Sequence, residues 1–117
     1  MRCLYVFRHP PYADSRGAEA LDLLLTLAAF DLTVEVLLLD EGVWHLAAGQ
    51  QPARIGQRRL PDLWQGLGLY GIERIWAGRE SLRQRRLSPQ RLLLPVTLVD
   101  EAALPQWWCG YDRIVED

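Results

Sequence analysis

The chain has 117 residues, half of them apolar and about a quarter charged, which excludes a disordered protein and suits one domain over residues 1–117. Its net charge of −2 leaves no basic excess for binding nucleic acid. All thirteen basic residues are arginine, which excludes lysine Schiff-base chemistry and a Walker-type phosphate loop. The apolar stretches are too short for a membrane span and the N-terminus does not read as a signal peptide, so we expect a cytoplasmic protein.

The first half of the chain predicts two strands with a helix between them. Residues 2–8 form a β-rich run that two prolines end. Within residues 16–30, leucines recur at the spacing of one apolar helix face. Residues 33–39 are mostly apolar, as in a strand that helices cover on both faces. A short helical turn is expected over residues 43–48.

The second half continues the alternation of helices and strands. Residues 53–68 predict a helix that restarts at Pro61, and residues 72–77 predict the third strand. We then expect a basic helix, a strand that Pro95 places at an edge or bulge, a last helix and a final strand, over residues 79–86, 92–99, 101–109 and 112–116. This order predicts a single three-layer α/β/α domain with a mostly parallel five-stranded sheet.

Ligands of such sheets bind beyond the carboxyl ends of the strands, which points to residues 9–15, 40–43 and 77–81. His9 could serve as a general acid or base, but no acid is next to it in sequence, so a turn residue or an interface contact is the favoured interpretation. The same loop continues with prolines and a tyrosine where a flavodoxin has hydroxyl-rich residues. This argues against an FMN cofactor.

The second loop carries adjacent carboxylates, Asp40 and Glu41. Paired acids can bind a metal or share a proton. Neighbouring residues of a strand point to opposite faces, however, so hydrogen bonding within the turn at Gly42 is favoured and no metal is expected. A response-regulator receiver would need an aspartate after strand three and a later lysine, and the sequence has neither.

The two cysteines, Cys3 and Cys109, are too far apart for a CxxC motif and too few for a zinc site. We expect both to be buried small apolar residues; the alternative is a reactive thiol, which requires exposure and a low pKa.

Arginines gather in residues 79–91. The cluster favours a solvated helix face, and the alternative is a grip on phosphate or an acidic partner. Its members are Arg79, Arg83, Arg85, Arg86 and Arg91.

Three stretches together resemble the DsrE/DsrF-like family of small sulfur-relay proteins, most closely its TusC (DsrF-type) subunits. They are "RGAEALDLLLTLAAF", "DEGVWHLAAGQQP" and "LGLYGIERIWAGRESLRQRRLSPQ", and the likeness runs nearly end to end. Ala18 and Ala20 depart from the glycine- and acid-containing run that is more usual in the first helix.

The resemblance suggests why no reactive side chain follows the third strand. Sulfur-carrying members of the family hold a persulfide on a cysteine just after the third strand, where this chain has Ala77 and Gly78. It therefore implies a non-catalytic subunit without cofactor, assembled with TusB-like and TusD-like chains in a heterohexamer. A TusA-like donor and a TusE-like acceptor would contact that complex, which serves thiolation of the tRNA wobble uridine.

Other functions stay open at this stage. One is a sulfur carrier or thiol enzyme that uses Cys109 or His9, and another is a DsrF-type subunit of a dissimilatory sulfur-oxidation complex. A third is a self-assembling regulator that binds an anion through the arginine cluster. The subunit interpretation predicts that aromatic side chains are buried against other chains, among them Trp44, Trp64 or Tyr70.

Overall fold

The computed structural model describes residues 2–11, 16–30, 33–47 and 60–117. Its centre is a five-stranded sheet in the order β4-β3-β2-β1-β5, in which each neighbouring pair of strands is parallel. The strands are β1 (Arg2–Phe7), β2 (Thr33–Leu38), β3 (Ile75–Gly78), β4 (Thr97–Val99) and β5 (Arg113–Glu116). The predicted parallel five-stranded sheet is confirmed.

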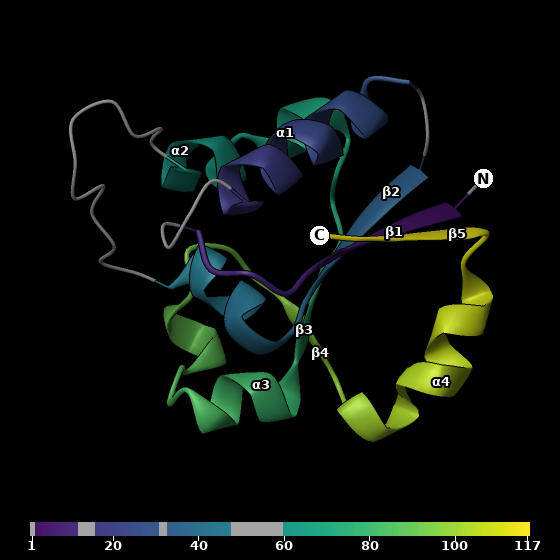
Figure 1. Cartoon of the computed structure of the whole chain (residues 1–117). Helices are drawn as coiled ribbons and strands as arrows, with labels where there is room; N and C mark the ends of the chain where they lie inside the picture. Colours follow the sequence, from purple (N-terminus) through teal and green to yellow (C-terminus); the bar gives the residue numbers. More distant parts are fainter. Residues whose placement is uncertain (1, 12–15, 31–32, 48–59) are drawn as a thin grey trace.

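Helices cover the two faces of the sheet unequally (Figure 1). On one face lie α1 (Arg16–Ala28) and α2 (Leu60–Gln65), and on the opposite face lies the short α4 (Leu104–Trp107). Another short helix, α3 (Arg79–Gln84), follows β3 directly. Right-handed crossovers explain this division, because the chain advances from β1 to β4 along one face and returns to β5 across the other. The result is the predicted three-layer arrangement.

Several predicted elements are shorter than expected. The strand predicted over residues 92–99 is confined to Thr97–Val99, because Pro95 has no N–H to donate to a ladder. The predicted edge position is confirmed, since β4 is the outermost strand on one side of the sheet. Residues 53–59 of the predicted helix lie outside the described residues, and the described helix begins at Leu60.

The last predicted helix, residues 101–109, divides into three pieces. A 3₁₀ turn at Glu101–Ala103 precedes α4, and another at Trp108–Gly110 follows it.

Two hydrophobic cores form because alternate residues of each strand point to opposite faces. Cys3, Tyr5 and Phe7 of β1 join the larger core under α1 and α2, while Leu4 and Val6 join the smaller core under α4. The larger core also contains Trp64, which is fully buried within this chain. The expectation that Trp64 is buried against another chain is therefore wrong.

A glycine brings the loop after β2 against the end of β1. This loop is a 3₁₀ helix, Asp40–Leu46. A Cβ at Gly42 would overlap the carbonyl of Phe7 and lie 3.1 Å from the backbone nitrogen of Arg8. Only glycine permits this approach, which sets the acids of one loop beside the basic end of the other.

Candidate functional site

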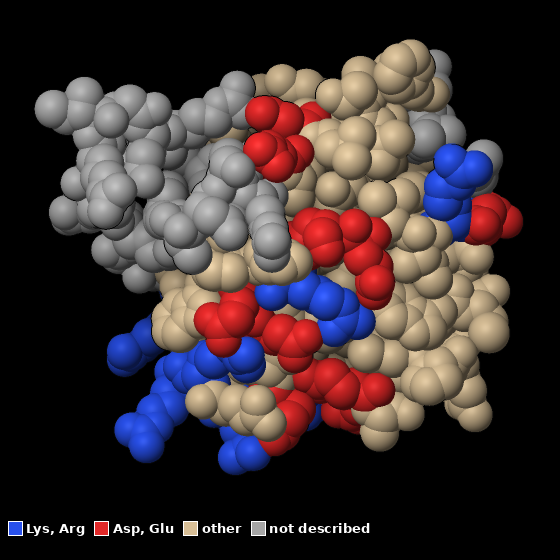
Figure 2. Space-filling view, in the orientation of Figure 1, with Lys and Arg blue, Asp and Glu red and all other residues tan. Residues whose placement is uncertain are grey.

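The carboxyl ends of the strands bring the described parts of the three predicted loops together, as expected for an open parallel sheet. Charged side chains of both signs intermix on this part of the surface, and basic ones extend over α3 (Figure 2). The surface over α4 is almost uncharged in the same view. Most of the described charged side chains at this edge form ion pairs or hydrogen bonds with one another.

The junction between β3 and α3 is closed by Glu101. A Cβ built on Gly78 would lie 2.8 Å from Cδ2 of Leu39 and 2.9 Å from the carboxyl carbon of Glu101. Glu101 reaches this position because β3 and β4 run parallel and pair Gly78 with Val99, so the chain beyond β4 emerges beside the junction. A larger side chain at Gly78 therefore requires Glu101 or Leu39 to move.

Glu101 also caps α3. Its Oε1 accepts a hydrogen bond from the backbone N–H of Glu80 (3.0 Å), and its Oε2 accepts one from that of Ser81 (2.7 Å). The first N–H groups of a helix have no partner within the helix, so this carboxylate supplies one. Burial raises the pKa of Glu101, but the hydrogen bonds from Glu80 and Ser81 outweigh burial and hold that pKa below its ordinary value.

Ser81 links the cap to the second loop. Its hydroxyl donates to Oε2 of Glu101 (2.8 Å) and accepts from the backbone N–H of Asp40 (3.0 Å). Asp40 has a φ of 52°, in the left-handed region that asparagine and aspartate tolerate better than most residues. Ser81 is buried with its hydroxyl engaged on both sides, which indicates a positioning residue rather than a nucleophile.

The expectation that Asp40 and Glu41 bond within their own turn is wrong. Asp40 forms an ion pair with Arg8 (2.8 Å) and Glu41 forms one with Arg85 (2.8 Å). The two carboxylates thus face different arginines instead of converging on a shared cation. Within the described residues, no group of three metal-ligating side chains forms.

His9 does have an acidic partner, from the other end of the chain. Its Nδ1 lies 3.1 Å from Oδ1 of Asp117, across 108 residues of sequence. Asp117 is almost fully buried and also accepts the backbone N–H of Arg8 at 2.8 Å. Because β1 and β5 are parallel neighbours, their ends are brought side by side. The pair resembles the orienting half of a catalytic dyad, but no nucleophile lies beside it among the described contacts.

A second histidine, the buried His45, holds the backbone of His9 from the core side. Its Nε2–H donates to the carbonyl oxygen of His9 (3.0 Å), and its Nδ1 accepts from Nε1–H of Trp64 (3.2 Å). Burial lowers the pKa of His45 to about 4, so the imidazole is neutral at neutral pH. Nothing in the sequence signalled this role, because the three residues meet only through the fold.

The two cysteines differ in their exposure to solvent. Cys3 is buried, as predicted, and burial raises the pKa of its thiol. Cys109 is exposed, so the expectation that it is buried is wrong. The segment after α4 turns outward, and the Cys109 thiol donates to the carbonyl oxygen of Pro105 (3.4 Å). Neighbouring Gly110 bonds to Arg2 at the start of β1, which places Cys109 toward the amino edge of the sheet, opposite the β3–α3 junction.

The arginine cluster is mostly neutralised by nearby acids, as a solvated helix face would be. Arg79 pairs with Asp100 (2.8 Å), Arg85 with Glu41, and Arg83 with its neighbour on the helix, Glu80. In the part of the chain that the structure describes, Arg86 and Arg91 form no ion pair. Two unpaired arginines are few for gripping a nucleic-acid backbone.

Comparison with solved structures defines the fold class. The structure resembles the ychN protein from E. coli with a TM-score of 0.81 and 18% identity, covering 100% of both chains. It also resembles a protein of unknown function from Methanobacterium thermoautotrophicum, with a TM-score of 0.72 and 18% identity over 99% and 98% of the chains.

Sequence comparison then identifies the family. The pattern of the DsrE/DsrF-like family matches residues 1–116, and the chain belongs to that family. It is 38% identical to "Protein TusC homolog" of Pseudomonas aeruginosa, over 96% of this chain and 94% of that protein. It is 34% identical to "Protein TusC" of Escherichia coli O9:H4 (strain HS), over 97% of each. The predicted resemblance is confirmed.

Proposed function

We propose that this chain is a non-catalytic structural subunit of a TusBCD-like sulfur-relay complex, which passes persulfide sulfur toward 2-thiolation of the wobble uridine of tRNA. Family membership and the likeness to proteins named TusC support a place in such a complex. By that resemblance its partners are TusB-like and TusD-like subunits in a cytoplasmic heterohexamer. A TusA-like donor and a TusE-like acceptor contact the complex. None of the helices that the structure describes could cross a membrane.

The observation that carries the non-catalytic part is Glu101 at the β3–α3 junction. A persulfide-bearing cysteine there would use the N-terminus of α3 to stabilise its negative charge. In this chain Glu101 already accepts the N–H groups of that helix end. The carboxylate thus takes the place of the anion, and Gly78 has no room for a thiol unless Glu101 or Leu39 moves.

Exposed apolar side chains support assembly with other subunits. Leu69 is 92% exposed and Phe30 is 72% exposed, and Tyr70 is about half exposed. Residues 102–111 carry no charged side chain, which agrees with the uncharged surface over α4 in Figure 2. Large exposed apolar surfaces are typical of protein–protein interfaces. Tyr70 thus remains a candidate interface residue, and Trp44 is only partly buried.

The test is to follow sulfur through the purified complex. The complex is loaded with ³⁵S persulfide from a cysteine desulfurase and the donor protein, and its subunits are separated without reductant. The label should reside on a partner subunit and not on this chain. Persulfide on Cys3 or Cys109 during turnover would contradict the proposal. Wobble 2-thiouridine in a deletion strain then separates tRNA thiolation, which lowers it, from a dissimilatory sulfur-oxidation complex, which leaves it unchanged.

One observation favours a second candidate function, a sulfur carrier that uses Cys109. This thiol is exposed and could accept sulfur from a donor. It lies toward the amino edge of the sheet, however, away from the β3–α3 junction where the resemblance places the sulfur-carrying cysteine. The same labelling experiment decides between the two functions.

A further inference from the structure

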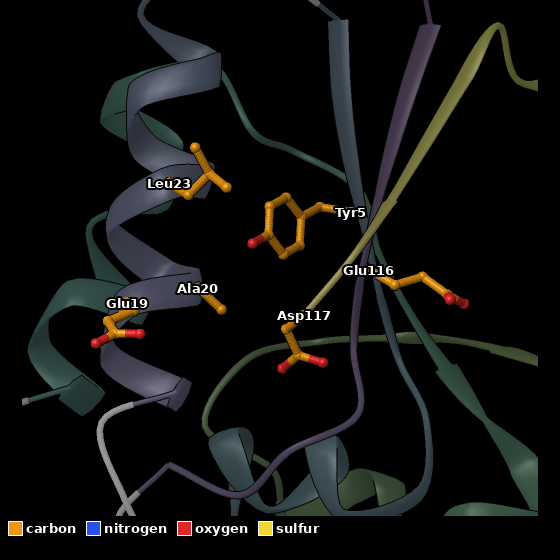
Figure 3. Close-up of a pocket in the computed structure, with 6 residues that line it drawn as sticks. All are labelled: Tyr5, Glu19, Ala20, Leu23, Glu116 and Asp117. Atoms are coloured by element: carbon orange, nitrogen blue, oxygen red, sulfur yellow. The ribbon is translucent and has the colours of Figure 1, made fainter.

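A groove that shares Asp117 with the carboxyl-edge network lies between α1 and the end of β5 (Figure 3). It has a volume of about 240 Å³, below the roughly 300–1,000 Å³ of sites for drug-sized ligands. Its lining residues are Tyr5, Glu19, Ala20, Leu23, Glu116 and Asp117. The size suits one amino-acid side chain better than a cofactor.

The groove is partly apolar because α1 presents a small residue to it. Glu19 and Leu23 lie one helical turn apart on the same face, with Ala20 beside them. Figure 3 shows Ala20 and Leu23 across the groove from the ring of Tyr5. The short side chain of Ala20 leaves the space open, and a longer one would fill it.

Tyr5 supplies a buried hydroxyl that has no hydrogen-bond partner among the described residues. The residue is only 2% exposed, and its hydroxyl points from β1 toward α1 (Figure 3). Burial, with the nearby charge of Asp117, raises the pKa of Tyr5 to about 12, so the hydroxyl stays protonated at neutral pH. A buried polar group without a partner is uncommon and calls for a ligand or another explanation.

Asp117 supplies the negative charge. Its side chain is 3% exposed and accepts the backbone N–H of Arg8, the ring nitrogen Nδ1 of His9 and, at 3.3 Å, the backbone N–H of His9. A carboxylate can accept about four hydrogen bonds, so Oδ2, with one long bond, retains capacity. Glu19 adds a charge on α1, whereas the side chain of Glu116 points away from the groove and pairs with Arg8 at 3.2 Å.

We propose that this groove binds the side chain of an arginine from a neighbouring subunit. The aliphatic stem would lie on Leu23, which is 46% exposed, and the guanidinium would donate to the Tyr5 oxygen and the Asp117 carboxylate at the base of the groove. Charge complementarity identifies the occupant, because the groove offers acceptors and negative charge. The partner assignment rests on the proposed function, since it takes the arginine from a subunit of the relay complex.

Arginine fits better than other cationic groups. Its planar guanidinium carries five N–H donors and stacks on aromatic rings, so it can serve both acceptors while contacting Tyr5. Its apolar stem matches the Ala20 and Leu23 side of the groove. The groove also opens beside β5, which among the described strands pairs only with β1, so that another chain can approach its outer edge.

The first test uses Tyr5→Phe and Ala20→Leu in the purified complex. Tyr5→Phe removes only the hydroxyl, so its melting temperature should be unchanged or higher. Its affinity for the partner subunits should fall roughly 10-fold, the loss of one hydrogen bond to a charged group. Ala20→Leu should weaken binding further by filling the groove, and its melting temperature is measured as well because Ala20 also contacts the larger core. Tyr70→Phe, which removes a hydroxyl outside the groove, is the matched control. Wild-type affinity in both groove variants would overturn the proposal.

The second test does not need the complex. The ¹⁵N-labelled chain is titrated with N-acetyl-arginine methylamide, and the amide resonances of Ala20 and Leu23 are followed. Saturable shifts that Ala20→Leu abolishes support the groove. Absent shifts, or tighter binding of the matching lysine compound, overturn the arginine assignment. If the wild-type chain forms no complex, the proposed function fails, and this titration alone decides whether the groove binds arginine.

Discussion

Gly78 and Glu101 occupy one small volume between them: the glycine leaves a space at the end of β3, and the glutamate fills it. A methyl group on Gly78 would lie 2.9 Å from the carboxyl carbon of Glu101. The glutamate in turn accepts the N–H groups at the start of α3. Under the proposed function, this is the position where a sulfur-carrying relative would hold a thiol, and in this chain the Glu101 carboxylate fills it.

Substituting Gly78→Cys should destabilise the fold by about 1–3 kcal/mol, because the new side chain overpacks against Leu39 and Glu101. Gly68→Cys is the matched control, since no atom lies within 4 Å of a Cβ built there. Urea unfolding of the two variants measures the difference. Equal stabilities would show that the junction is not closed as described.

Replacing Glu101 by alanine should cost about 2–3 kcal/mol of stability, because it removes the cap of α3 and the acceptor of the Ser81 hydroxyl. Because its folded pKa is lowered, the contribution of Glu101 is present above the unfolded value of 4.5 and is lost as pH falls below it. The difference between wild type and Glu101→Ala should therefore shrink in urea titrations below pH 4.5. A difference that stayed constant with pH would assign the effect to packing alone.

His45 should make stability fall between pH 6.5 and pH 4. Burial lowers its folded pKa to about 4 from an ordinary 6.5, so the unfolded chain binds the proton first and acid favours unfolding. The full effect is about 3 kcal/mol at the lower limit. Unfolding free energies at pH 7.5, 5.5 and 4.5 measure it. Glu35 and Glu101, whose folded pKa values are lowered from 4.5, lose their contributions as pH falls below about that value. The step from pH 7.5 to pH 5.5 therefore reports His45 most directly.

A His45→Asn variant is the control for that measurement. It should be less stable at neutral pH, because asparagine cannot reach both Trp64 and the carbonyl of His9 as the imidazole does. Its stability should also vary less between pH 6.5 and 4.5 than that of wild type. An unchanged slope would mean that another group titrates there.

The two thiols should differ in their reactivity toward alkylating agents, and neither should be needed for tRNA thiolation. Iodoacetamide should alkylate exposed Cys109 in the native chain and buried Cys3 only after unfolding, as mass spectrometry of timed samples would show. The double variant Cys3→Ala, Cys109→Ser should restore wobble 2-thiouridine in a deletion strain. Cys3→Ala alone should cost about 1 kcal/mol, since it shortens a core side chain. Failure of the folded double variant to restore thiolation would contradict a non-carrying role.

Local sequence patterns predicted most of the fold. The mostly apolar runs at residues 2–8 and 33–39 correspond to β1 and β2, and the leucine spacing of residues 16–30 corresponds to α1, because continuous apolar runs and helical spacing each report burial locally. The strand over residues 92–99 was overextended, since its leucines pack on the core from an irregular segment rather than from a strand. The apolar character of a segment indicates that it is buried, but it does not by itself distinguish a strand from an irregular segment.

The site was less predictable, because its contacts join residues far apart in sequence. His9 has no acidic neighbour along the chain, and only the parallel pairing of β1 with β5 delivers Asp117 to it. Glu101 likewise reaches Gly78 through the pairing of β3 with β4. Cys109 was expected to be a buried small apolar residue because no cysteine motif includes it, yet the turn after α4 leaves it exposed.

The most direct test of the central claim is to recover the tagged chain from its own host after mild lysis and to weigh its assembly by native mass spectrometry. A stable complex with two other small chains, one of which bears a cysteine after its third strand, is the predicted result. A chain that is recovered alone, or only with copies of itself, would contradict a structural role in a sulfur-relay complex.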